Sequence, residues 1–176
     1  MTQTGVGTGT IGSTAFTNAA FTITEQADTA SRQSFIGVFW IDNISAAISI
    51  AGVGDFSFIS ATRCFVSVGA DEVGFSRAGF NGLDLLEGPT NFAFVSWDML
   101  GSIGPITGVG KLMQWTSSPG SPAPPVITTG GTLIFNNANG MNTTFQATVT
   151  SAPEPGSAAL LGLGTLLLAA RRRRRA

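Results

Sequence analysis

Histidine and tyrosine are absent from this 176-residue chain, and cysteine occurs once. Without histidine, the Ser-His-Asp and Cys-His catalytic arrangements and histidine-dependent zinc sites are excluded. The single cysteine, Cys64, excludes an internal disulfide and a cluster of thiolate ligands. Cys64 lies in a strand-like run over residues 58–68. We expect a buried structural thiol there, because no histidine is present to activate it as a nucleophile.

Charged residues are scarce, at 11% of the chain. Before Pro153, only Arg32, Arg63, Arg77 and Lys111 stand against nine acidic residues, so this part carries a net charge of about −5. A nucleic-acid partner is excluded, because it requires a basic stripe interleaved with aromatic residues. Glycine is abundant, at 23 residues. This small-residue, weakly charged composition is typical of an exposed extracellular body and disfavours a cytosolic helical protein.

Helical periodicity is missing before residue 156, and short apolar runs bounded by glycine take its place. Residues 35–41 form a continuous apolar run that suits a strand buried on both faces. The turn residues 52–55 predict a hairpin between runs 44–51 and 56–60. Further strands are expected over residues 9–16, 21–24, 58–68, 73–77, 92–100, 111–116, 132–136 and 144–150.

About ten short strands with glycine-rich connections predict an all-β fold, a single β-sandwich-like domain over residues 1–152. One helical turn is expected over residues 82–87. Residues 117–125 are rich in serine and proline and make the clearest break in composition. We interpret them as a surface loop, because the chain after them contains only two strand-like runs, too few to bury a core. Residues 153–176 form a separate C-terminal segment.

Two pairs of acidic residues are the remaining candidates for catalysis. Asp71-Glu72 and Asp84…Glu87 are carboxylates of the kind that glycosidases use. However, adjacent acids in a strand point to opposite faces, and residues 69–72 are typical of a turn, so a solvated loop is expected. A Ca²⁺ site built from Asp71, Glu72 or Asp84 is chemically allowed, but no Asp-x-Asp-x-Asp-Gly loop is present. We therefore predict no catalytic residue, no metal and no cofactor.

The C-terminal segment combines three features in a fixed order. Pro153, Glu154 and Pro155 precede fifteen apolar or small residues, and five arginines follow. The apolar run begins at Gly156 and ends at Ala170, and its leucines are Leu160, Leu161, Leu163, Leu166, Leu167 and Leu168. The basic cluster is Arg171, Arg172, Arg173, Arg174 and Arg175. No face of a helix in this run would be polar, so the pattern predicts one transmembrane helix with the arginines in the cytoplasm. It would be short, because fifteen residues span about 22 Å of a roughly 30 Å hydrocarbon core.

This arrangement resembles the PEP-CTERM sorting signal of Gram-negative and related envelope-building bacteria, over about the last two dozen residues. The resemblance implies an exosortase as processing partner, with Pro153, Glu154 and Pro155 as its recognition element. It further implies an inner-membrane form before processing, and a cell-surface or extracellular form associated with exopolysaccharide or biofilm afterwards. Residues 1–7 lack the basic and apolar regions of an export signal, so we expect either an upstream start or a fragment.

Two non-enzymatic functions compete for the body of the chain. The first is that of an envelope or matrix protein associated with exopolysaccharide. The second is that of a module that binds sugar or ice. Trp40, Trp97 and Trp115 are candidates for stacking on sugar rings, although a tryptophan flanked by strand residues is more often part of a core. Ice binding favours a regular threonine ladder, and the threonines at positions 2, 4, 8 and 10 do not keep that regularity.

Overall fold

The computed structural model describes residues 1–79, 83–117 and 123–150. In these residues the chain is almost entirely β-structure, with twelve strands in one sheet. The strands are β1 (Thr2–Ile11), β2 (Thr14–Ala27), β3 (Gln33–Phe35), β4 (Val38–Ile50), β5 (Gly54–Ser57), β6 (Thr62–Ser67), β7 (Glu72–Arg77), β8 (Asp84–Thr90), β9 (Ile103–Leu112), β10 (Val126–Thr128), β11 (Gly131–Phe135) and β12 (Ala138–Ala147). Two short 3-10 turns, η1 (Thr29–Ser31) and η2 (Phe92–Phe94), accompany them.

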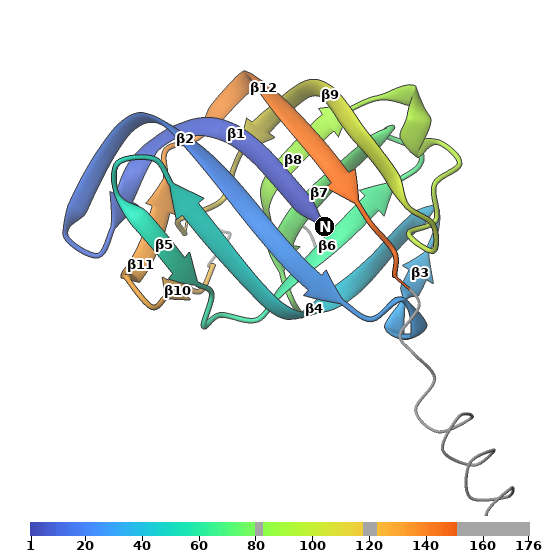
Figure 1. The fold of residues 1–176 in the computed structure, drawn as a ribbon, viewed down its shortest axis with the longest axis horizontal. Helices are drawn as coiled ribbons and strands as arrows, with labels where there is room; N and C mark the ends of the chain where they lie inside the picture. Colours follow the sequence, from blue (N-terminus) through green and yellow to red (C-terminus); the bar gives the residue numbers. More distant parts are fainter. Residues whose placement is uncertain (80–82, 118–122, 151–176) are drawn as a thin grey trace, which may run out of the picture.

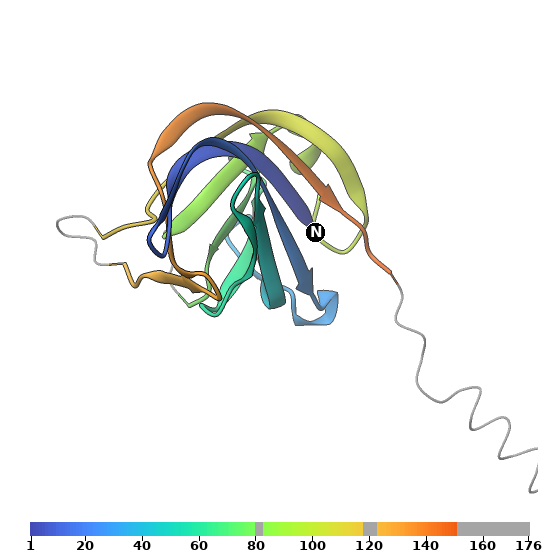
Figure 2. The same cartoon turned by 60° about the vertical axis from the view of Figure 1, so that its left-hand side comes forward.

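The sheet closes on itself. Its strands follow the order β1-β12-β9-β8-β7-β6-β4-β2, and β2 pairs back onto β1 along almost its whole length. Figures 1 and 2 show the strands curving round until β1 and β2 lie side by side. The all-β class is confirmed, but the predicted β-sandwich is wrong, because the fold is a closed eight-stranded barrel with four further strands. Closure leaves the ring without a free edge, which two packed sheets would have kept.

Strands β4 and β1 carry the extra strands. Residues 38–42 of β4 pair with β6, whereas residues 47–50 pair with β5. Residues 2–4 of β1 similarly pair with β12, and residues 9–11 pair with β11. Each strand therefore changes neighbour along its length, and β5, β10 and β11 lie at the same end of the barrel in Figure 1.

Glycines on β1 make room for the aromatic core. Gly5 and Gly7 face inward, and a Cβ at either position would overlap the ring of Phe21 or Phe135. These two rings lie 4.9 Å apart, between centroids, in a cluster that also contains Trp115. In β1, glycine alternates with threonine and valine because alternate residues of a strand face opposite sides. The glycines take the inward positions, where a side chain would collide with the rings.

Three expected elements differ in the structure. Residues 35–41 are no continuous strand, because Ile36 and Gly37 adopt positive φ angles of 43° and 75° and turn β3 into β4. Residues 92–100 contain η2 and a loop, whose Phe94 and Trp97 are buried in a second cluster at the other end of the barrel. The helical turn expected over residues 82–87 is also wrong, because residues 84–87 belong to β8.

The predicted transmembrane helix is not seen. In the ranges 1–79, 83–117 and 123–150, no helix is long and apolar enough to cross a membrane. The apolar run of residues 156–170 on which the prediction rested lies outside the described residues.

Candidate functional site

A cavity of about 650 Å³ lies on the outer wall of the barrel. Its floor is made by β4, β6, β7 and β8, and β3 forms one side. The inner face of β4 holds Ile41, so its neighbours Trp40 and Asp42 point outward. We call this cavity the wall pocket; it is lined by Ser34, Phe35, Val38, Trp40, Arg63, Phe65, Ser67, Glu72, Ser76 and Asp84.

Aromatic rings form one half of the wall pocket. Trp40 on β4 is paired in register with Phe65 on β6, so that both project from the same face. The Phe65 ring lies across Gly74 of β7, where a Cβ would overlap it. The Arg63 guanidinium stands over the Trp40 ring, 5.7 Å from its centroid.

The other two tryptophans belong to the core. Trp115 donates its indole N–H to the Leu85 carbonyl at 2.8 Å, and Trp97 donates to Gly101 at 2.9 Å. Trp115 is 1% exposed and Trp97 is 7% exposed. Of the three tryptophans that the sequence offered for stacking, Trp40 lines the wall pocket and is half-buried, whereas Trp97, which borders a second cavity of about 650 Å³, is 7% exposed.

Carboxylates form the other half of the wall pocket. Glu72 and Ser76 project outward from β7, and Asp84 is paired in register with Ser76. In a regular strand, Asp84 and Glu87 would point to opposite faces, because they are three residues apart. A β-bulge in β8 buries Leu85 and Leu86 together and returns Glu87 to the outer face, opposite Gly74. The expected solvated loop is wrong for Glu72, which lies in β7, although Asp71 does lie in a turn.

The positive charges near these acids are already paired. Lys111 on β9 forms an ion pair with Glu87. On the opposite side of the pocket, Arg63 Nε lies 3.0 Å from Asp42 Oδ1. Glu72 and Asp84 are thus left as surplus carboxylates, since no described basic side chain lies within ion-pair distance of either.

Both surplus carboxyl groups have raised pKa values. Burial, and next the charge of Glu87, raise the pKa of Asp84 to about 7. The same two causes raise the pKa of Glu72 above its ordinary value. Near neutral pH Asp84 is therefore protonated in part.

Ser76 contributes a hydroxyl to the lining of the wall pocket. The residue is 2% exposed and lies in register between Arg63 of β6 and Asp84 of β8. Polar side chains beside aromatic rings suit a ligand that carries both apolar and hydrogen-bonding faces.

The remaining candidates from the sequence are Cys64 and a metal site built from acidic residues. Cys64 is fully buried in β6, which confirms the expected structural thiol, and burial raises the pKa of that thiol. In the described part of the chain, no three acidic or cysteine side chains converge in a way that could hold a metal ion.

Threonines cross the opposite side of the barrel. Thr4 of β1 pairs with Thr22 of β2 and with Thr144 of β12, which in turn pairs with Thr107 of β9. This row bends with the closed barrel wall (Figure 2). It therefore lacks the flatness that an ice-binding ladder favours.

The comparisons with known proteins concern the C-terminal segment. Residues 151–175 match the family model of the PEP-CTERM protein-sorting motif, which confirms the resemblance carried by Pro153, Glu154 and Pro155. These residues, the leucine run and the arginines of residues 171–175 lie outside the described residues. No curated protein and no solved structure matches the chain.

Proposed function

We propose that this PEP-CTERM protein, which is exported and sorted through its C-terminal motif, acts as a non-enzymatic glycan-binding protein of the cell surface or extracellular matrix. The observation that carries the proposal is the wall pocket, in which Trp40 and Phe65 lie next to Ser76 and two carboxyl groups. Sugar rings present apolar C–H faces to aromatic rings and hydroxyls to polar side chains, which is the division found here. An exosortase is the processing partner of such motifs, and exopolysaccharide is the proposed glycan.

The arrangement of the acids supports binding over glycoside hydrolysis. Hydrolysis requires two carboxyl groups on either side of the scissile bond, about 5 to 9.5 Å apart. Glu72, Asp84 and Glu87 all lie on the neighbouring strands β7 and β8, on one side of the pocket. The facing side is aromatic, and its Asp42 is already paired with Arg63.

The proposed ligand contact at Trp40 can be removed without emptying the core. Because Trp40 is only half-buried and points away from the barrel interior, Trp40→Ala is expected to leave the thermal midpoint nearly unchanged. Affinity for a bound oligosaccharide should fall about thirtyfold, as for a tryptophan that contributes about 2 kcal/mol to binding. Isothermal titration of the full chain with neutral hexose and hexosamine oligomers measures this effect.

Trp40→Phe serves as the matched control, because it keeps an aromatic face at the same position. It should retain most of the affinity that Trp40→Ala loses. If no oligosaccharide binds, or if binding is indifferent to Trp40→Ala, the wall pocket is not a glycan site.

Processing at the sorting motif gives a separate prediction. Glu154 is the charged member of the Pro-Glu-Pro motif, so Glu154→Ala should slow removal of the C-terminal segment in a host that carries an exosortase. Mass spectrometry of the surface fraction would show the loss of the five arginines from the wild type and their retention in the variant. Glu72→Ala, which also removes one glutamate but lies in the barrel, should be processed normally. Recovery of surface protein with Ala176 intact would refute this role of the motif.

A further inference from the structure

The wall pocket has more carboxyl groups than basic side chains. Glu72 and Asp84 line it, and the nearby cations Arg63 and Lys111 are paired with two other acids, Asp42 and Glu87. A ligand that brings its own positive charge would therefore complete the site, whereas an anionic ligand would add to the repulsion.

The position of the surplus acids is specific. Asp84 is paired in register with Ser76, and Glu72 lies four residues before Ser76 on the same face of β7. The hydroxyl of Ser76 lies in the same pocket as the two acids. The cavity of about 650 Å³ therefore brings a hydroxyl and two carboxyl groups within reach of one ligand.

The aromatic half of the pocket limits what the cation can be attached to. Trp40 and Phe65 offer flat apolar surface next to the carboxyl groups, and Phe35 of β3 extends that surface. A bare metal ion would leave the apolar surface of these rings uncovered, and the acids of the described residues do not converge on a metal position. A sugar ring bearing an ammonium group uses both halves at once.

We propose that the wall pocket selects glycans that carry free amino groups, with the ring stacked on Trp40 and the ammonium paired with Asp84 and Glu72. This assignment names the substrate class of the glycan site proposed above and rests on it. N-acetylated hexosamines bind more weakly at this site, because they lack the charge. Uronic acids are rejected, because their carboxylate would face Asp84 and Glu72.

The test compares four probes on the purified full chain at pH 7 and low salt. The probes are a β-1,4-linked glucosamine tetramer, its N-acetylated counterpart, a galacturonate tetramer and tetralysine. We expect the glucosamine tetramer to bind about tenfold more tightly than the N-acetylated one, as for one partly buried ion pair. The galacturonate tetramer and tetralysine should show no measurable binding.

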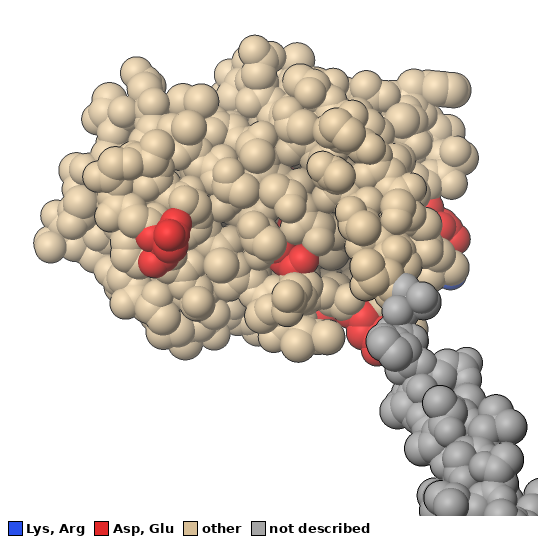
Figure 3. Space-filling view, in the orientation of Figure 1, with Lys and Arg blue, Asp and Glu red and all other residues tan. Residues whose placement is uncertain are grey.

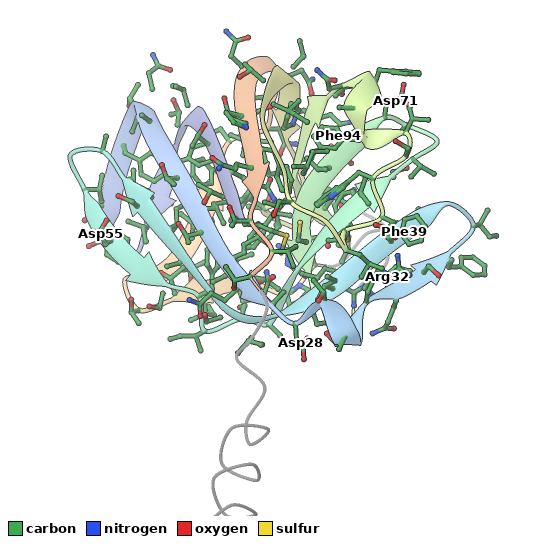
Figure 4. All side chains as sticks on the ribbon, turned by 45° about the vertical axis from the view of Figure 1, so that its right-hand side comes forward. Asp28, Arg32, Phe39, Asp55, Asp71 and Phe94 are labelled. Carbon is green, nitrogen blue, oxygen red and sulfur yellow. The ribbon has the colours of Figure 1, made fainter. Side chains whose placement is uncertain are left out.

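Variants that remove one carboxylate charge and keep a similar side-chain shape test whether the preference for the free amino group depends on charge. Asp84→Asn should reduce the tenfold preference to within about twofold and leave the affinity for the N-acetylated tetramer unchanged. Glu72→Gln provides a second removal of surplus charge if the first variant folds poorly. Asp55→Asn is the matched control, because Asp55 on β5 lies on the opposite side of the molecule from Asp71 and Arg32 (Figure 4). It removes the same charge and should keep the full preference.

The outcomes distinguish this inference from the proposed function. Binding of the N-acetylated tetramer that depends on Trp40, with no preference for the free amine, overturns the inference and leaves the glycan site standing. Tetralysine binding as tightly as the glucosamine tetramer shows a site for cations in general and overturns the assignment to amino sugars. Binding of no glycan at all overturns both.

Discussion

Arg77→Lys is expected to lower the free energy of unfolding by about 3 kcal/mol, one of the two largest effects predicted for this chain. Arg77 ends β7, is 2% exposed and donates three hydrogen bonds to backbone carbonyls. Its Nε bonds to Pro124 O at 2.9 Å, Nη1 to Gln114 O at 2.9 Å and Nη2 to Trp115 O at 3.3 Å. The guanidinium thereby fixes two stretches of chain, residues 114–115 and 124, against the barrel.

Lysine keeps the charge but cannot reproduce this geometry. An ammonium group has no planar fork, so at least two of the three carbonyls lose their donor. Each hydrogen bond from a charged group contributes about 1.5 to 3 kcal/mol, and unpaired buried carbonyls add to the loss. Trp115, which is 1% exposed, would feel the change directly, because its own backbone carbonyl is one of the three acceptors.

Urea unfolding of the full chain, followed by tryptophan fluorescence, measures the loss. Arg32→Lys is the matched control, since the ion pair of Arg32 with Asp98 is 27% and 45% exposed at its two side chains. Such a pair contributes less than about 1 kcal/mol. If Arg77→Lys costs no more than the Arg32 control, the three carbonyls are not held by Arg77.

The sequence predicted the β-class because turns and alternation are local signals. Residues 52–55 predicted a hairpin, and the structure has one, with its turn at residues 51–53 and β5 beginning two residues earlier than expected, at Gly54–Ser57. Barrel closure is not local, because it requires β1 at the start of the chain to pair with β12 near its far end. A sandwich and a barrel share the same strand pattern, so length and alternation could not separate them.

The acidic half of the wall pocket was missed for a definite reason. The sequence places Asp84 and Glu87 three residues apart, which in an ideal strand means opposite faces. The bulge at Leu85-Leu86 reverses that conclusion. Two consecutive leucines inside an otherwise alternating run were the available signal, because both could be buried only if the pairing slipped by one residue. Trp40 was among the candidates, but its partner Phe65 was predicted only as part of a strand.

The sequence correctly predicted that the chain before Pro153 carries little charge, but it did not predict where the acidic side chains lie. Figure 3 shows isolated acidic groups on a surface with almost no basic side chains in view. The acids that matter for the fold and the site are buried instead. Glu25 on β2 is 2% exposed and lies inside the barrel, next to Gln3 of β1 and Asn43 of β4.

Glu25 gives the barrel a pH-dependent stability. Burial raises the pKa of its carboxyl group from 4.5 to about 7, against smaller lowering effects from the hydrogen bond with Asn43, the charge of the N-terminal amino group and the hydrogen bond with Gln3. The folded state binds this proton more tightly than the unfolded state does. Proton binding by Glu25 therefore makes its full contribution to the free energy of unfolding below pH 4.5. This contribution is lost as the pH rises towards 7, at about 1.4 kcal/mol per pH unit.

The neighbouring amides show how the protonated form is accommodated. Gln3 Nε2 and Asn43 Nδ2 donate to the Glu25 carboxylate at 3.0 Å and 2.9 Å. Their own oxygens, Gln3 Oε1 and Asn43 Oδ1, are buried without a hydrogen-bond donor. A protonated Glu25 can donate to one of these oxygens once that amide turns over, and the introduced amide of Glu25→Gln can do the same at every pH.

The stability of Glu25→Gln relative to the wild type is therefore expected to increase as the pH rises. Relative to its value at pH 4.5, the difference in unfolding free energy between the two proteins should shift by about 3 kcal/mol in favour of the variant at pH 8. Urea unfolding of both chains across this range measures the shift. Glu72 and Asp84 also have raised pKa values, but they remain in both proteins, so their contribution cancels in the difference.

Asp84→Asn, on the outer wall, should make the stability of the protein less dependent on pH, independently of Glu25. The double variant should therefore show the sum of the two effects. Parallel stability curves for wild type and Glu25→Gln would show that the pKa of Glu25 is the same in the folded and unfolded chains.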